Sequence, residues 1–211
     1  MLLTGFGAFP GVPDNATARL VAALSEAARG RFAARFVADV LPVEWVAAPQ
    51  RLSQLLAAHR PQVALHFGVS HEAQGFAIER CGRNTCAATP DAAGALPKLA
   101  HLDPDGPPAR TASLPVERLV ARLAALGLPA CISESAGTYL CNALLYHSLG
   151  AGTTPDGGRL TGFVHIPAEL AGSGGGSRTT LHRLDWDGAL AGGLEIVAVC
   201  LEEVAALEQA D

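Results

Sequence analysis

The chain has 211 residues, of which 49% are hydrophobic and 17% charged, and its formal net charge is −5. This apolar content excludes a disordered chain, and the length predicts one α/β domain over residues 1–211 with an ample core. The acidic balance and the lack of a Lys/Arg cluster argue against nucleic acid as a partner. No apolar stretch is long enough to span a membrane, and residues 1–5 lack the basic start of a signal peptide. We therefore expect no membrane partner and a cytoplasmic location.

The spacing of the apolar residues predicts strands and helices that alternate along the chain. In chain order we expect a strand at 1–5, a helix at 16–28, a strand at 36–41, a helix at 44–59, a strand at 63–67 with a turn at 68–70, a strand at 75–79, a surface excursion at 85–111, a helix at 116–126, a strand at 128–132, a helix that opens near Cys141, a strand at 161–166, a mobile loop at 172–177 and a helix at 187–207. Such alternation predicts a mostly parallel twisted sheet covered by helices on both faces, a three-layer α/β/α sandwich.

The five cysteines are Cys81, Cys86, Cys131, Cys141 and Cys200. Their odd number and wide spacing, without a secretory signal, argue against a disulfide framework. They form no Cys-x-x-Cys pair and do not match the spacing of zinc ligands, so we expect no metal. Cys131 and Cys200 lie in apolar runs, which indicates that both are core residues.

The segment 133–142 places Cys141 just after a Ser/Gly turn, where a helix is predicted to begin. A thiol in the first turn of a helix meets unpaired backbone N–H groups and the positive end of the helix dipole. Both favour the thiolate over the thiol, so Cys141 is a candidate nucleophile at neutral pH. The chemistry then needs a base and a group that orients it.

Ligands of such sheets bind at the carboxyl ends of the strands. His165 follows one strand at this edge and is the polar residue best placed to serve Cys141 as a base. Glu79, in an otherwise apolar strand, is the acid best placed to orient that histidine, since a carboxylate there is costly unless it is paired. The spacing leaves a second interpretation equally open, in which Glu79 forms a structural ion pair with Arg80 or Arg83.

Four blocks, in order along the chain, resemble the pyroglutamyl peptidase I family, the C15 cysteine peptidases. The first reads T-G-F-G-A-F at 4–9, with Asn15 downstream; the second runs from G-V-S at 68–70 to E-R-C-G-R-N at 79–84; the third reads S-E-S-A-G-T-Y-L-C-N at 133–142; and the fourth reads F-V-H-I-P at 163–167. One such block is weak, but four in this order are specific.

The resemblance implies a phosphorylase/hydrolase-like fold and a cysteine peptidase that hydrolyses the bond after an N-terminal pyroglutamyl residue. Peptides with such a residue are then the substrates, and 5-oxoproline is released. It implies that Cys141 attacks the carbonyl, that His165 holds the proton and later protonates the leaving amine, and that Glu79 fixes the imidazole. It implies no cofactor, and a homo-oligomer, either a dimer or a tetramer.

By the same resemblance, Phe6 and Phe9 hold the flat lactam ring between them, Asn15 shapes the wall, and Leu140 belongs to the substrate-binding set. The alternative for the two phenylalanines is ordinary core packing, which is the usual role of isolated aromatic residues. Their place on a glycine-flanked loop after the first strand favours a site, because such loops commonly carry function.

The chain departs from the family pattern at several positions. Ser135 stands where the family usually has Asp, and Ala8 stands where it usually has Pro. Since Ser can cap a helix as Asp does, we expect a modest effect at position 135. The loop after Asn84 is short and has no Arg before Pro90. These departures leave open weak activity or a shifted substrate, whereas the complete set of Glu79, Cys141 and His165 argues against an inactive homologue. Two rival functions remain: a related cysteine amidase for a different small acyl group, and a binding protein that has no catalytic activity.

Overall fold

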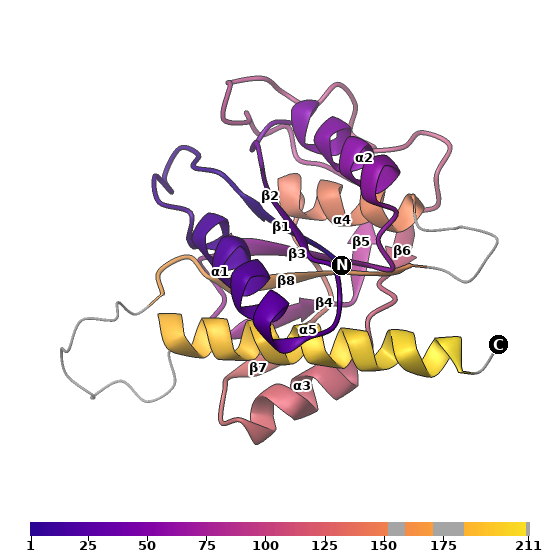
Figure 1. Ribbon diagram of the computed structural model, residues 1–211. Coiled ribbons are helices and arrows are strands. Elements are labelled where there is room, and N and C mark those ends of the chain that lie inside the picture. Colours follow the sequence, from indigo (N-terminus) through magenta and orange to yellow (C-terminus); the bar gives the residue numbers. More distant parts are fainter. Residues whose placement is uncertain (152–158, 171–183, 210–211) are drawn as a thin grey trace.

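The computed structural model describes residues 1–151, 159–170 and 184–209, and a six-stranded sheet lies at its centre (Figure 1). The sheet has the order β2-β1-β3-β8-β4-β7. Its strands are β1 (Leu2–Phe6), β2 (Val37–Leu41), β3 (Val63–Ser70), β4 (Phe76–Glu79), β7 (Ala130–Ser133) and β8 (Leu160–Pro167). The first four strands in the sheet order are mutually parallel, whereas β4 is antiparallel to β8 and parallel to β7. The predicted mostly parallel sheet is confirmed, with β4 and β7 running against the other strands.

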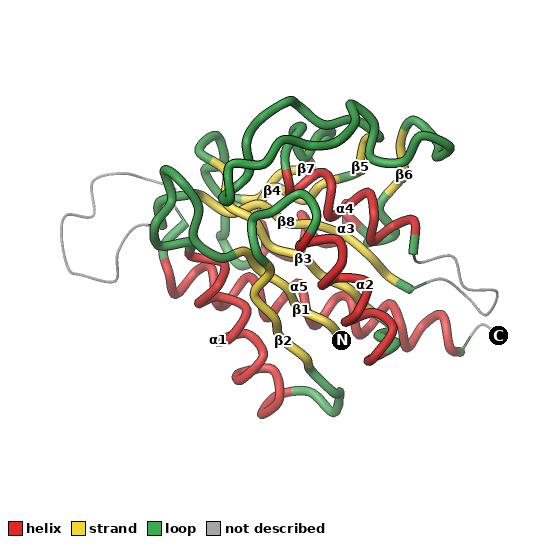
Figure 2. The backbone as a smooth tube through the Cα atoms, turned by 90° about the horizontal axis from the view of Figure 1, so that it is seen from above, coloured by secondary structure: helices red, strands yellow, loops and turns green. Residues whose placement is uncertain are grey.

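Helices cover both faces of this sheet, as the sequence predicts (Figures 1 and 2). One face carries α1 (Ala16–Arg31), α3 (Val116–Ala125) and α5 (Trp186–Glu208), and the other carries α2 (Ala47–His59) and α4 (Leu140–Gly150). Each face has its own apolar core between the sheet and its helices. A separate antiparallel pair, β5 (Cys81–Arg83) and β6 (Ala109–Thr111), lies beside α4.

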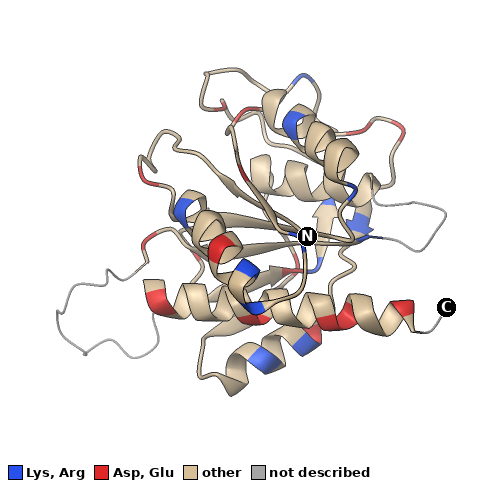
Figure 3. Ribbon diagram, viewed as in Figure 1, with Lys and Arg blue, Asp and Glu red and all other residues tan. Residues whose placement is uncertain are grey.

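Local sequence signals explain where the helices on the first face begin and how they associate. Asn15 caps α1 by accepting a hydrogen bond from the Thr17 N–H, and Asp185 caps α5 in the same way from the Gly188 N–H. Oppositely charged side chains then join α3 to α5, as the adjacent blue and red bands of Figure 3 show. These ion pairs connect Arg118 and Arg122 with Glu195, Glu202 and Glu203. None of the described helices is both long and apolar enough to cross a membrane.

Two elements differ in kind from their prediction. The segment 68–70, predicted as a turn, continues β3, because β8 offers pairing partners as far as Pro167. Part of the predicted surface excursion 85–111 forms β6 against β5. Both differences arise from a partner strand that is distant in the sequence. The predicted loop at 172–177 lies outside the described residues.

Cys131 contradicts its prediction as a core residue, because its side chain is exposed. Its neighbours in β7, Ala130 and Ile132, pack against the core on the α3 and α5 face. Successive side chains of a strand point to opposite faces, so Cys131 lies on the other face of the sheet. Cys200 is buried, as the sequence predicts.

His66 of β3 is fully buried and connects the sheet to α4. Its Nδ1 lies 2.7 Å from Thr4 Oγ1 on β1, and its Nε2 lies 2.8 Å from Ser148 Oγ on α4. A neutral imidazole has one donor and one acceptor, so both ring nitrogens are satisfied by these hydroxyls. Burial, with the charge of Arg159 as a smaller cause, lowers the pKa of His66 to about 3.

We expect acid to destabilise the protein through His66. The ring binds a proton in the unfolded chain below its ordinary pKa of 6.5 but stays neutral in the folded protein down to about pH 3. The free energy of unfolding therefore falls as the pH drops through this window, by about 1.4 kcal/mol per pH unit from this group. Urea unfolding at about pH 6.5 and pH 5 should show a loss about 1.6 kcal/mol smaller in His66→Gln, which keeps a donor and an acceptor but cannot become charged. Equal losses in both proteins would contradict this role.

Candidate active site

Cys141 lies in the first turn of α4, where the sequence predicts a helix to open. The residue before this helix, Tyr139, has an extended backbone, and its side chain makes no capping hydrogen bond within the described residues. First-turn N–H groups have no acceptor inside the helix and form the positive end of its dipole. The thiol therefore lies beside backbone donors that can bind an oxyanion.

The sulfur of Cys141 lies directly over Gly68 of β3. A Cβ atom at Gly68 would be 2.9 Å from Cys141 Sγ and 2.7 Å from the ring of Phe163, closer than real Cβ atoms approach their neighbours. Gly68 is paired with His165 on the adjacent strand β8. A residue without a side chain at position 68 thus leaves the space in which sulfur and imidazole meet.

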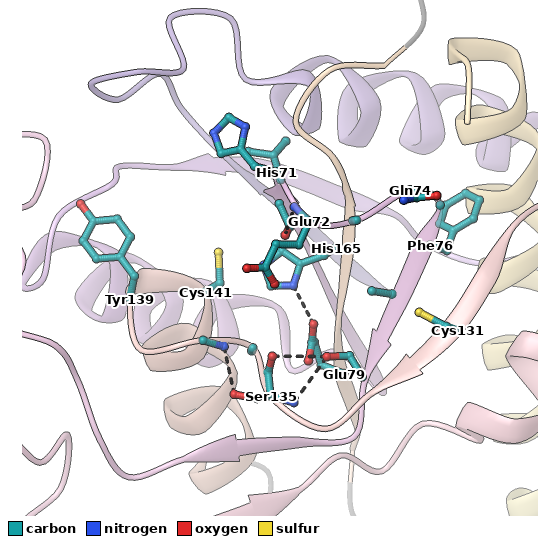
Figure 4. Close-up of a pocket in the computed structure, with 18 of the residues that line it drawn as sticks. His71, Glu72, Gln74, Phe76, Glu79, Cys131, Ser135, Tyr139, Cys141 and His165 are labelled. Carbon is teal, nitrogen blue, oxygen red and sulfur yellow. Dashed lines mark hydrogen bonds and ion pairs between the residues drawn. The ribbon is translucent and has the colours of Figure 1, made fainter. Parts of the chain in front are cut away.

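His165 and Glu79 form a buried pair beside this sulfur (Figure 4). His165 Nδ1 lies 2.7 Å from Glu79 Oε1, and the two residues are 7% and 1% exposed. Glu79 does not pair with Arg80 or Arg83: Arg80 pairs with Glu117 and Glu134, and Arg83 donates to the Glu134 carbonyl. The structure therefore brings Glu79 to the histidine.

Opposing influences set the charge of His165. Burial lowers the pKa of His165, but a neighbouring Cys141 thiolate and its hydrogen bond raise it, and so does the Glu79 carboxylate. The contributions of Cys141 and Glu79 outweigh that of burial, and the pKa of His165 is raised to about 10. The imidazole is consequently held as a cation between two groups that can carry negative charge.

The direction of β4 and β7 corrects one part of the sequence interpretation. The strand before Cys141 was expected to end at the same edge of the sheet as the other strands, but β7 runs in the opposite direction. The segment 134–139 carries the chain back to the start of α4. Glu79 lies at the carboxyl end of the equally reversed β4 and reaches His165 from this neighbouring antiparallel strand.

A cavity of about 820 Å³ opens at this place and is lined by every residue that the sequence singled out for the site. These residues are Glu79, Cys141, His165, Phe6, Phe9, Asn15 and Leu140. No cluster of three or more His, Cys, Asp or Glu within the described parts of the chain is arranged to hold a metal ion.

The four residues expected to contact substrate also have structural roles. Phe6 is 3% exposed and Leu140 is 1% exposed, so both contribute to the core on the α2 and α4 face as well as to the cavity wall. Phe9 is half-buried. Asn15 accepts from the N–H and hydroxyl of Thr17 and donates to the Gly7 carbonyl at 3.1 Å, which fixes the loop between β1 and α1.

Tyr139 also lines the cavity, although the sequence did not predict this wall as part of the site. The Tyr139 hydroxyl donates to the Pro90 carbonyl at 3.1 Å, and its ring meets Trp45 edge to face at 5.2 Å. Asp91 is buried and accepts the Trp45 N–H at 2.9 Å, together with two further backbone N–H groups of its own turn. The Pro90-Asp91 pair is a turn signal that could have shown an ordered segment inside the excursion 85–111.

Comparisons with known proteins place the chain in a family. The family model described as pyroglutamyl peptidase matches residues 1–171. The chain is 34% identical to the pyrrolidone-carboxylate peptidase of Pyrococcus furiosus over 168 residues, which cover 79% of this chain and 80% of that protein. It is 38% identical to the pyrrolidone-carboxylate peptidase of Chromobacterium violaceum over 169 residues, which cover 79% and 77% of the two chains.

Solved structures are similar over nearly the whole chain. The pyroglutamyl peptidase I of Bacillus amyloliquefaciens superimposes with a TM-score of 0.80 at 28% identity and covers 94% of each chain. A mutant pyrrolidone carboxyl peptidase from the hyperthermophile Pyrococcus furiosus superimposes with a TM-score of 0.81 at 28% identity, over 96% of this chain and 98% of that one. Sequence and fold agree, and the chain belongs to the pyroglutamyl peptidase family.

Proposed function

We propose that this protein is a cysteine peptidase that removes the N-terminal pyroglutamyl residue from peptides and releases 5-oxoproline. The buried pair of His165 and Glu79 beside Cys141 is the observation that carries the proposal. A thiol, an imidazole and a carboxylate in this order form the nucleophile, the acid/base and the orienting group of acyl transfer. Membership of the pyroglutamyl peptidase family supports the choice of acyl group.

The geometry supports the following first half of the reaction. Glu79 holds His165 by Nδ1, so Nε2 is the ring nitrogen left to serve Cys141. The thiolate attacks the pyroglutamyl carbonyl carbon, and the carbonyl electron pair moves to oxygen. The resulting oxyanion is stabilised by first-turn N–H groups of α4, with that of Cys141 among them. His165 then gives its Nε2 proton to the amide nitrogen as the C–N bond breaks, which leaves a thioester on Cys141 and frees the shortened peptide.

In the second half, neutral His165 takes a proton from a water molecule that attacks the thioester carbonyl. The second tetrahedral intermediate collapses, the C–S bond breaks, and 5-oxoproline leaves. Cys141 returns as a thiolate beside a protonated His165. Glu79 keeps its charge throughout and stabilises the imidazolium in each half.

The cavity wall on the β1 side suits the acyl group. Pyroglutamate carries a small, flat, uncharged lactam, which fits an apolar slot with few polar contacts. Phe6, Phe9 and Leu140 supply apolar surface there, and Asn15 fixes the loop that carries the first two. We propose that these residues hold the ring. A related amidase for another small acyl group would keep the three catalytic side chains and differ in this slot.

We further propose a single domain over residues 1–211 that acts in the cytoplasm as a homo-oligomer. The C-terminal helix α5 packs on α1 near the chain's start, which supports one domain. Free thiols at all five cysteines suit a reducing compartment. The exposed Leu96 and Leu99, 56% and 57% accessible, offer apolar surface for association.

Substitution of the nucleophile tests the reaction directly. The wild-type protein should release aminomethylcoumarin from its pyroglutamyl amide and leave the prolyl amide intact, because a prolyl ring lacks the lactam carbonyl. Cys141→Ala should lose at least about 10⁴-fold in kcat, since it removes the covalent route. Cys81→Ser, whose sulfur lies outside the cavity, is the control and should remain active. Equal cleavage of both amides would reject the specificity, and an active Cys141→Ala would reject the mechanism.

Removal of the charge on Glu79 should lower both turnover and thiol reactivity. Because Glu79 raises the pKa of His165, Glu79→Gln weakens the imidazolium that pairs with the thiolate. We expect kcat to fall by about 100-fold or more, and alkylation of Cys141 by iodoacetamide near pH 6 to slow in parallel. Glu117→Gln, which removes an exposed partner of Arg80, is the matched control. If turnover and alkylation both match the wild type, Glu79 does not orient the histidine.

The space over Gly68 can be filled by one methyl group. In Gly68→Ala the new Cβ would meet Cys141 Sγ and the Phe163 ring at less than 3.0 Å, so the sulfur must shift. We expect kcat/KM to fall at least about tenfold and overpacking to cost about 1–3 kcal/mol of unfolding free energy. Gly30→Ala, where a Cβ meets nothing within 4 Å, controls for the loss of glycine. Full activity in Gly68→Ala would show that the sulfur does not need this position.

A further inference from the structure

The cavity extends well beyond the candidate catalytic groups, onto a part of the sheet that the lactam slot does not use. In addition to the slot it is lined by residues of β4, β7 and the segments before them, among them Gln74, Ala77, Pro129, Cys131 and Ser133. Figure 4 shows Cys131 on the opposite side of His165 from Tyr139. The cavity therefore extends to both sides of the sulfur and the imidazole. We call the side with the lactam slot the first arm and the side over β4 and β7 the second arm.

Among the described residues, no helix covers the sheet face that forms the floor of the second arm. Phe76 and Ile78 of β4 belong to the core on the α3 and α5 face. Because successive side chains of a strand point to opposite faces, Ala77 and Glu79 point to the other face. On β7, Cys131 pairs with Ala77 and Ser133 pairs with Glu79, so these two side chains lie on that face as well. Helices α2 and α4 pack over β2, β3 and β8 instead. We call the small side chains Ala77, Cys131 and Ser133 the β4/β7 trough.

The order of the strands assigns the two arms to the two halves of a substrate. Phe6 belongs to β1, the sulfur of Cys141 lies over Gly68 of β3, His165 belongs to β8, and the β4/β7 trough follows. His165 protonates the leaving nitrogen, so the leaving group lies on the His165 side of the sulfur. The acyl ring then occupies the β1 side, and the peptide continues across β4 and β7.

The dimensions of the trough fit a short stretch of peptide. From β8 to β7 there are two strand spacings, about 10 Å in all, and an extended chain advances about 3.4 Å per residue, so the floor accommodates about three residues. Ala77 is paired with both His165 and Cys131. The first residue of the leaving peptide therefore lies over the smallest side chains of the floor. There is room there for a large side chain.

We propose that the β4/β7 trough is the subsite for the leaving peptide, and that it takes a large apolar or aromatic side chain from the residue that follows pyroglutamate. This inference rests on the proposed function, because it assigns the leaving group of that same reaction. Cys131 is a specificity-determining residue on this view, because its exposed side chain lines the trough on the edge strand β7, in register with Ala77. A bulky residue in its place obstructs a peptide but not ammonia.

The test compares a large leaving group with a minimal one. The release of 5-oxoproline is measured from pyroglutamyl-phenylalanyl-alanine and from pyroglutamamide, whose leaving group is ammonia. In Cys131→Phe, the kcat/KM of the tripeptide relative to that of pyroglutamamide should fall at least tenfold. Cys131→Leu, which adds less bulk, should give a smaller fall in the same direction. Leu126→Phe, which adds a ring at an exposed position outside the cavity, should leave the ratio within twofold of wild type.

The outcomes separate the two proposals. If the wild type cleaves both substrates and neither substitution at Cys131 moves the ratio by more than twofold, the trough does not hold the leaving peptide and the proposed function stands. If the wild type releases 5-oxoproline from neither substrate, the proposed function itself is wrong. Thermal unfolding of each variant, expected within a few degrees of wild type because Cys131 is exposed, shows that a changed ratio reflects the site.

Discussion

The buried contact between Glu79 and His165 is the constraint on which the site depends. A carboxylate that is 1% exposed is costly unless an opposite charge compensates it, and only one of its two oxygens makes a hydrogen bond within the described residues. The imidazolium supplies that charge, and the same ring is hydrogen-bonded to Cys141. The arrangement that makes Glu79 tolerable in the sheet therefore also holds the imidazole beside the proposed nucleophile.

Strand β3 sets the position of the helix that carries the proposed nucleophile. His66 holds the rear of α4 through Ser148, and Gly68, two residues later on the same face, leaves room for the sulfur at its front. Asn142 adds a third attachment, because its amide bonds the backbone of Arg83 and Thr85 beside β5. A helix fixed at both ends holds its first-turn N–H groups in place, as stabilisation of an oxyanion requires.

Much of the fold and of the candidate site could be predicted from local patterns. Alternating apolar periods placed the helices and the strands of the main sheet to within a few residues, and the thiol at the opening of α4 was evident from the Ser/Gly turn before it. The turn predicted at 68–70 and the core position predicted for Cys131 were wrong. Periodicity cannot show how far a distant partner strand extends, nor which face of a strand remains without a helix.

The sequence by itself determined the elements, the three-layer class, the candidate nucleophile and its candidate base, because these depend on spacing along the chain and on the chemistry of single residues. The tertiary structure alone decided that Glu79 pairs with His165 rather than with Arg80 or Arg83, and that β4 and β7 run against the other strands. It also decided that, among the described residues, a face of those two strands lines a cavity beside the imidazole. The physical reason is that strand direction and charge pairing are set by contacts between segments far apart in sequence. Their free energies arise only when the whole sheet has formed.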